Sequence, residues 1–346
     1  MIINVGLSPN SVVDLGSLKQ GSTAPALQAT LAEWLQSHGA VLMSSKAEAQ
    51  ALIQTVKNGV DLTESERHRW RELLYWLQRG GRLTVAQPEL TPLEDSRDLN
   101  DAPGSLHRPY LAVVSNETFG HLHPDSDEGI VTYPGDLDIA TSGAATLSPL
   151  FERAKLTANV DVYKPGRSRE EVWNEVLRPL AIRTKQVTIF DPYVFSEMYR
   201  RDDVSDSSSE HLEWLLAKLN STAPQGTMVK IFGWRKGTRS AVRPSGASPS
   251  QIAQLLRQRW SEAPNRVTGV ELITLPAGQR FPHDRHIMFG DTTGLELPSG
   301  LDRLAQPTLV QPFSFGYKSK NPQLEALRYR VTTVQGLSAV VTPLNL

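Results

Sequence analysis

The sequence predicts an α/β protein with two domains. Its 346 residues exceed the usual length of a single domain. Short β-branched runs alternate with segments of helical periodicity along both halves, and this alternation is typical of sheets covered by helices. Residues 124–143 are rich in Asp, Gly and Ser, which indicates a loop. We therefore expect the domains to span residues 1–145 and 146–346.

Four strands and three helices are expected in the first half. The strands are short apolar runs, namely Ile2–Val5, Ala40–Met43, Leu83–Val85 and Leu111–Val114. The helices carry apolar residues three or four positions apart, in Pro25–His38, Ala47–Lys57 and Thr63–Leu77. Thr63 and Glu66 form a capping-box pattern at the start of the third helix, and Gly80 follows its end. Besides 124–143, residues 88–109 are also expected to be a loop.

The second half continues the alternation. A capping-box pattern at Ser168 and Glu171 opens the first expected helix, which runs to Leu180. Two more helices are expected at Leu212–Leu219 and Pro249–Trp260. The expected strands are Gln186–Phe190, Thr227–Phe232, Val270–Leu275 and His283–Phe289.

Composition limits the classes of function. No apolar run approaches the eighteen residues of a membrane span, and the start lacks the pattern of a signal peptide, so we expect a cytoplasmic protein with no transmembrane segment. The absence of cysteine excludes disulfides, thiolate metal sites and a cysteine nucleophile. A formal net charge of −1 excludes a basic field over the whole protein, although Lys230–Arg243 is locally basic. We expect neither a cofactor nor a metal.

The segment Phe281–Phe289 carries the strongest chemical signal. In an extended strand, His283 and Arg285 point to one face, with Asp284 and His286 on the other. A guanidinium offers a fork of donors that suits phosphate, and an imidazole can serve as nucleophile or proton donor. Downstream, Ser299 and Gly300 form a small turn whose hydroxyl and backbone N–H groups could complete an anion pocket.

These motifs carry a resemblance to a known family. The stretch His283–Leu304, with its HDR motif and Gly-Leu-Asp ending, resembles the phospholipase-D-like domain at the C-terminus of MIT-domain proteins, and Asp191-Pro192-Tyr193 matches an upstream motif of that family. The resemblance covers about half of the chain. It implies catalytic roles for His283 and Arg285 in an active member. The phosphate-binding residues that it implies are Asp191, Tyr193, Ser299, Gly300 and Asp302.

The chain departs from the active phospholipase D pattern, H-x-K-x4-D. Arg285 replaces the lysine, Asp291 lies one residue too far along, and no second copy of the motif is present. A mechanism with two histidines would therefore need a homodimer. Three hypotheses stay open: phosphate-diester recognition without turnover, a metal-independent phosphodiesterase or nuclease, and a structural assembly subunit. Bacterial relatives imply a multi-gene conflict or anti-phage system, with nucleic acid and a protein as partners.

The first half resembles PIN-like nuclease domains. Such nucleases hold a divalent metal with clustered carboxylates, but Asn4 and Asn116 stand where acidic residues would be wanted. We therefore expect a degenerate PIN-like, Rossmann-like domain that binds or acts as a scaffold. His121 and His123 are metal-ligand types, and we interpret them as ordinary loop residues.

Overall fold

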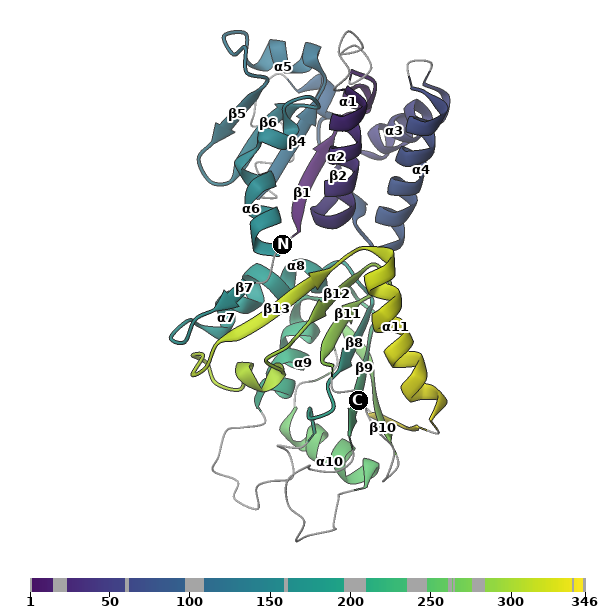
Figure 1. The fold of residues 1–346 in the computed structure, drawn as a ribbon, viewed down its shortest axis with the longest axis vertical. Coiled ribbons are helices and arrows are strands. Elements are labelled where there is room, and N and C mark those ends of the chain that lie inside the picture. The colour runs from purple at the N-terminus through teal and green to yellow at the C-terminus, as the bar shows by residue number, and fades with distance from the viewer. Residues whose placement is uncertain are drawn as a thin grey trace. The chain divides into compact units, whose positions relative to one another are not determined.

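The computed structural model shows two compact units, 1–157 and 158–346, each with its own sheet (Figure 1). The predicted α/β class with two domains is confirmed. Nearly all of helix α6 (Pro149–Ala158) belongs to the first unit and lies beyond the boundary expected at residue 145. The structure describes residues 2–14, 24–59, 62–96, 109–158, 161–195, 210–234, 248–260, 263, 265–275, 284–337 and 339–344.

The sheet of the first unit has the strand order β3-β2-β1-β4-β6-β5. All neighbouring strands are parallel except the edge strand β5, which is antiparallel to β6. The chain moves outward from β1 and then returns to the other side of it at β4, as in doubly wound, Rossmann-like folds. The strands are β1 (Ile3–Leu7), β2 (Gly39–Met43), β3 (Leu83–Val85), β4 (Tyr110–Val114), β5 (Ile130–Tyr133) and β6 (Leu137–Thr141).

Apolar residues cover both faces of this sheet. Val41 and Met43 of β2 belong to one buried cluster, and Leu42 between them belongs to the cluster on the other face. Burial on both faces explains why the strands are continuous apolar runs. The helices are α1 (Pro9–Asp14), α2 (Ala24–His38), α3 (Lys46–Asn58), α4 (Glu64–Arg79), α5 (Asn116–Leu122) and α6, with short 3-10 turns at Leu93–Asp95 and Ala145–Leu147.

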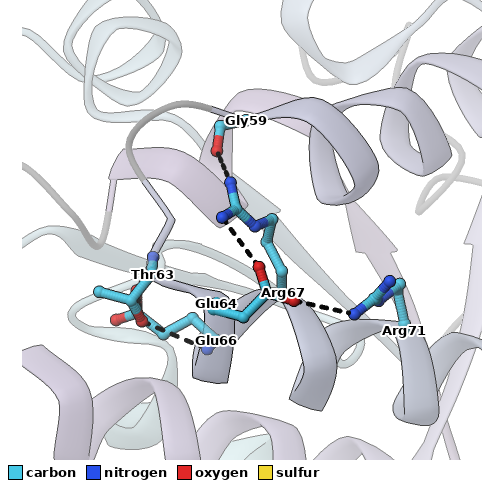
Figure 2. A network of polar contacts seen from close by, with 6 residues as sticks. All are labelled: Gly59, Thr63, Glu64, Glu66, Arg67 and Arg71. Carbon is cyan, nitrogen blue, oxygen red and sulfur yellow. Dashed lines mark hydrogen bonds and ion pairs between the residues drawn. The ribbon is translucent and has the colours of Figure 1, made fainter.

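The start of α4 confirms the predicted capping box. The Glu66 N–H donates to Thr63 Oγ1 at 3.3 Å, and the Thr63 N–H donates to Glu66 Oε2 at 2.7 Å. Figure 2 shows that Arg67 extends this network, because it pairs with Glu64 at 3.0 Å and donates to the carbonyl of Gly59 at 3.2 Å. The end of α3 is thereby tied to the beginning of α4.

The prediction of a loop at residues 124–143 is wrong. This segment contains β5 and β6, and β6 is a fully buried strand of the sheet. The sequence pattern did not indicate β6 because the strand contains a polar residue, Asp138. Asp138 can be buried because its carboxylate accepts a hydrogen bond from the Ser148 hydroxyl, which lies outside the strand. In the other expected loop, Leu93–Asp95 form a 3-10 turn, and residues 97–108 lie outside the described residues.

The second unit has an eight-stranded mixed sheet with the order β14-β10-β9-β8-β11-β12-β13-β7. Strands β8, β9 and β10 are parallel to one another, and every other neighbouring pair is antiparallel. The strands are β7 (Asp161–Tyr163), β8 (Gln186–Phe190), β9 (Thr227–Trp234), β10 (Val267–Leu275), β11 (His286–Phe289), β12 (Thr293–Glu296), β13 (Phe313–Lys318) and β14 (Val340–Leu344).

The helices of the second unit differ from the prediction at two places. The Ser168 hydroxyl caps α7 by accepting from the Glu170 N–H, whereas Glu171 pairs with Arg167, so the expected capping box is wrong. Helix α11 (Figure 1) had no counterpart in the prediction. Its Val334 and Phe190 of β8 belong to one buried cluster. The helices are α7 (Arg169–Val172), a π-turn at Trp173–Leu177, α8 (Arg178–Ala181), α9 (Glu210–Thr222), α10 (Pro249–Arg259), the 3-10 helix η7 (Leu301–Leu304) and α11 (Asn321–Gly336).

No described helix combines the length and the apolar character that a membrane crossing requires.

Close packing between Gly6 and Tyr110 gives a stability prediction for the first unit. A Cβ at Gly6 would lie 2.0 Å from Tyr110 Oη and 2.7 Å from Leu93 Cδ1. Gly6→Ala should therefore destabilise the first unit by about 1–3 kcal/mol through overpacking. Tyr110→Phe removes a buried hydroxyl that has no hydrogen-bond partner among the described residues, so this change alone should not destabilise.

The double variant tests the cause. Gly6→Ala combined with Tyr110→Phe should recover part of the lost free energy of unfolding, measured by urea titration, because the clashing oxygen is gone. Strict additivity of the two changes would contradict this account.

Candidate functional site

The site begins where β8 ends and β11 begins. The two strands are antiparallel, and His286 lies opposite Phe190. Asp191 directly follows β8 and Arg285 directly precedes β11, so the register brings these two residues together. Because side chains alternate along a strand, both point away from the face that holds Phe190 and His286. The ion pair between two distant segments of the chain is thus a product of strand pairing.

Arg285 is held from three sides. Its Nε lies 3.7 Å from Asp191 Oδ1, and its Nη1 lies 3.8 Å from Asp302 Oδ1. Its Cζ lies 4.8 Å from the centroid of the Tyr193 ring, which is a cation–π contact. Both ion-pair distances exceed a normal hydrogen bond, and 23% of the side chain is exposed. The guanidinium is therefore oriented by charge and by the ring, and its N–H groups remain able to donate to an oxyanion.

Asp191 orients the arginine from a buried position. Its Oδ1 accepts a 2.8 Å hydrogen bond from the Tyr193 N–H, and its Oδ2 lies 3.5 Å from the Leu301 nitrogen. Burial raises the pKa of the Asp191 carboxyl, although these two N–H groups and the positive charge of Arg285 act in the opposite direction. The carboxylate therefore joins the end of β8 to the segment at Leu301.

Gly300 lets the backbone approach the guanidinium. Its φ is 81° and its ψ is 164°, a conformation that side chains rarely adopt. A Cβ there would lie 2.1 Å from Arg285 Nη1 and 2.4 Å from Asp302 Oδ1. The turn thus needs glycine for both its backbone and its surroundings.

The groups of this turn that we expected to contact phosphate have other partners. The Ser299 hydroxyl donates to the carbonyl of Ser314 at 3.3 Å and accepts from the Ser314 N–H at 3.0 Å. The Gly300 N–H donates to the carbonyl of Leu297 at 2.9 Å. The Ser299 hydroxyl therefore anchors the turn to β13, and its phosphate contact stays a prediction.

The predicted strand from His283 to Phe289 is wrong at its start. Strand β11 begins at His286, so Arg285 lies before it, and His283 lies outside the described residues. Asp284 is exposed and its Oδ2 pairs with Arg330 of α11 at 3.3 Å. Of the expected phosphate-site residues, the structure brings together Arg285, Asp191, Tyr193, Gly300 and Asp302.

Sequence reasoning missed the environment of His286. This residue is fully buried, and its ring stacks on Phe190 with a centroid distance of 4.6 Å. Neither ring nitrogen has a hydrogen-bond partner among the described residues. Burial, assisted by the positive charge of Arg330, lowers the pKa of His286 to about 3. Its side chain points to the face covered by α11, and no local pattern indicates a helix that lies so far along the chain.

The candidate metal ligands of the first unit are used in local contacts. His121 Nδ1 lies 2.8 Å from the carbonyl of Glu117, and the His123 ring lies 3.2 Å from Tyr133 Oη. Among the residues that the structure describes, no group of three or more His, Asp or Glu side chains is arranged to hold a metal ion.

Comparison with known proteins gives little guidance. No protein-family model matches the chain, and no curated protein matches it. Among solved structures, phosphatidylserine synthase from Haemophilus influenzae Rd KW20 is similar at 14% identity and a TM-score of 0.34. The match covers 53% of this chain and 39% of that chain. A similarity this low defines neither a family nor an activity, so the MIT C-terminal resemblance stays a prediction.

The buried state of His286 predicts acid sensitivity. Because its pKa falls from 6.5 to about 3 in the folded chain, the unfolded chain binds more protons between these two values. The free energy of unfolding should therefore fall as pH drops from 6.5 towards 3, by about 1.4 kcal/mol for each pH unit at most. His286→Phe, which keeps the stacked ring, should flatten this slope in urea titrations at several pH values. An unchanged slope in the variant would assign the acid sensitivity to other groups.

The Gly300 turn gives a second prediction for this site. Gly300→Ala should destabilise the second unit by about 1–3 kcal/mol from backbone strain and should also displace Arg285, because the new Cβ overlaps the guanidinium. Gly226→Ala is the matched control, since Gly226 has φ of 84° and a Cβ there would meet nothing within 4 Å. Thermal unfolding measures both. Equal losses in the two variants would show that the contact with Arg285 adds nothing.

Proposed function

We propose that the second unit recognises a phosphate diester through Arg285. The observation that supports this proposal is the state of the guanidinium: two carboxylates and an aromatic ring orient it, yet both carboxylates lie beyond hydrogen-bond distance. A phosphate that approaches from solvent can accept two parallel N–H bonds from such a planar group.

Orientation before binding favours affinity. An arginine side chain loses conformational freedom when it is fixed by a ligand, and this loss costs about 0.5–1.5 kcal/mol. The Tyr193 ring and the buried Asp191 already restrict Arg285 in the unbound chain. Most of the conformational entropy of the Arg285 side chain is therefore already lost on folding, and ligand binding reduces it little further.

Nucleic acid is the diester that we propose as ligand. In the sequence, β9, the parallel neighbour of β8, is followed by Arg235, Lys236, Arg239 and Arg243, which lie outside the described residues. Because the chain as a whole is nearly neutral, such binding would depend on local charge and would weaken as salt rises. A protein partner from a multi-gene defence system, which the sequence resemblance implies, belongs to the same proposal and would be identified by pull-down.

Substitution of Arg285 tests the recognition. Arg285→Gln should weaken binding of single-stranded DNA or RNA by about 10- to 100-fold, because charge-assisted hydrogen bonds contribute about 1.5–3 kcal/mol. Arg285→Lys keeps the charge but loses the fork of donors, so its affinity should be intermediate. Fluorescence anisotropy at two salt concentrations measures both. Arg153→Gln removes the same charge from an exposed ion pair of the first unit and should have little effect.

Two results would contradict recognition without turnover. Equal affinities of Arg285→Gln and Arg153→Gln would remove Arg285 from the binding site. Cleavage of the nucleic acid in EDTA, lost in His283→Ala, would replace simple recognition with a metal-independent phosphodiesterase of the phospholipase D type.

A further inference from the structure

Two carboxylates flank Arg285, and they differ in exposure. The Asp191 side chain is 4% exposed and accepts the Tyr193 N–H, whereas the Asp302 side chain is 49% exposed. Asp191 is therefore a fixed part of the fold. Asp302 is the second residue of η7, and its carboxylate is open to solvent.

The Asp302 carboxylate lies beside the Nη1 end of the guanidinium. Its Oδ1 is 3.8 Å from Arg285 Nη1, and this same nitrogen lies against the backbone of Gly300. An oxyanion that binds Nη1 from solvent must displace the Asp302 carboxylate or lie beside it. The sequence-based expectation that Asp302 helps to bind phosphate is therefore physically unfavourable, since an ionised carboxylate has no proton to donate.

The competition between Asp302 and a ligand for Arg285 depends on the charge of the ligand. One guanidinium and two ionised carboxylates leave a net charge of −1. A phosphate diester carries one negative charge, and a phosphate monoester carries nearly two above pH 7. Because the Coulomb energy is proportional to the ligand charge, Arg285 attracts and Asp302 repels the monoester about twice as strongly as the diester. Removal of the Asp302 charge alone should therefore raise the affinity for the monoester more than the affinity for the diester.

We propose that Asp302 is a competing carboxylate that shifts the preference of the Arg285 site from doubly charged phosphate monoesters towards singly charged diesters. This inference rests on the proposed function of Arg285 and names the charge class of its ligand. Asp302 would thereby lower the affinity for terminal phosphates more than the affinity for internal diester linkages.

A pair of probes that differ by one methyl group tests the selection. Thymidine 5′-monophosphate is a monoester, and its methyl ester is a diester of the same shape. At pH 8 the ratio of the affinity for the methyl ester to the affinity for the monophosphate should be higher in the wild type than in Asp302→Asn. Asp302→Asn should raise the affinity for the diester by about 5-fold and for the monoester by about 30-fold, as expected for one unit charge a few ångströms away in water. Calorimetry or NMR titration measures both affinities.

Asp284→Asn is the matched control. Asp284 is 58% exposed and adjacent to Arg285 in sequence, but its carboxylate pairs with Arg330. The substitution removes the same charge and should leave the preference between the two probes unchanged. An equal shift in both variants would show that the effect is one of overall charge, and would overturn the inference.

The remaining outcomes separate the inference from the function on which it rests. If Arg285→Gln abolishes binding of the methyl ester while Asp302→Asn changes neither affinity by more than about twofold, recognition stands and the role of Asp302 is wrong. If Arg285→Gln has no effect, or if neither probe binds the wild type or Asp302→Asn, both proposals are wrong.

Discussion

The ion pair between Asp191 and Arg285 is the constraint on which the candidate site depends. Its existence requires the antiparallel register of β8 and β11, which places the end of one strand beside the start of the other. A buried carboxylate costs free energy unless its oxygens are paired, and here the Tyr193 N–H and the arginine supply partners. The Gly300 turn then closes against the guanidinium because it carries no side chain.

Local patterns were sufficient to predict elements whose partners lie nearby in sequence. The capping box of α4 depends on residues three positions apart, and β8 was predicted with its observed bounds. The local capping-box pattern at Ser168 nevertheless failed, and two other failures have partners ten and fifteen residues further along the chain. Asp138 is accommodated in β6 by Ser148, and the hydroxyl of Ser299 is satisfied by Ser314. The residue types at the site were predictable, but which of them oppose one another was not.

In the first unit, two carboxylates accept hydrogen bonds from backbone N–H groups beyond the carboxyl ends of β1 and β4. In doubly wound sheets, ligands bind beyond the carboxyl ends of the strands where the order reverses, here between β1 and β4. The Glu94 carboxylate accepts from the Asn10 N–H and side-chain amide at 2.6 and 2.7 Å, and Asp14 accepts from the Asn116 N–H at 2.5 Å. These carboxylates of the chain itself occupy backbone N–H groups of the kind that bind anions at helix starts.

The contact between Arg285 and Tyr193 also gives the site a built-in spectroscopic reporter. The guanidinium carbon lies 4.8 Å from the ring centroid, over the ring, so the ring current of the tyrosine shields the nearby arginine protons. Their resonances should be displaced from those of exposed arginines in the same spectrum. Any ligand that draws the guanidinium away from the ring would return them towards ordinary positions, and occupancy could be followed without attaching a label.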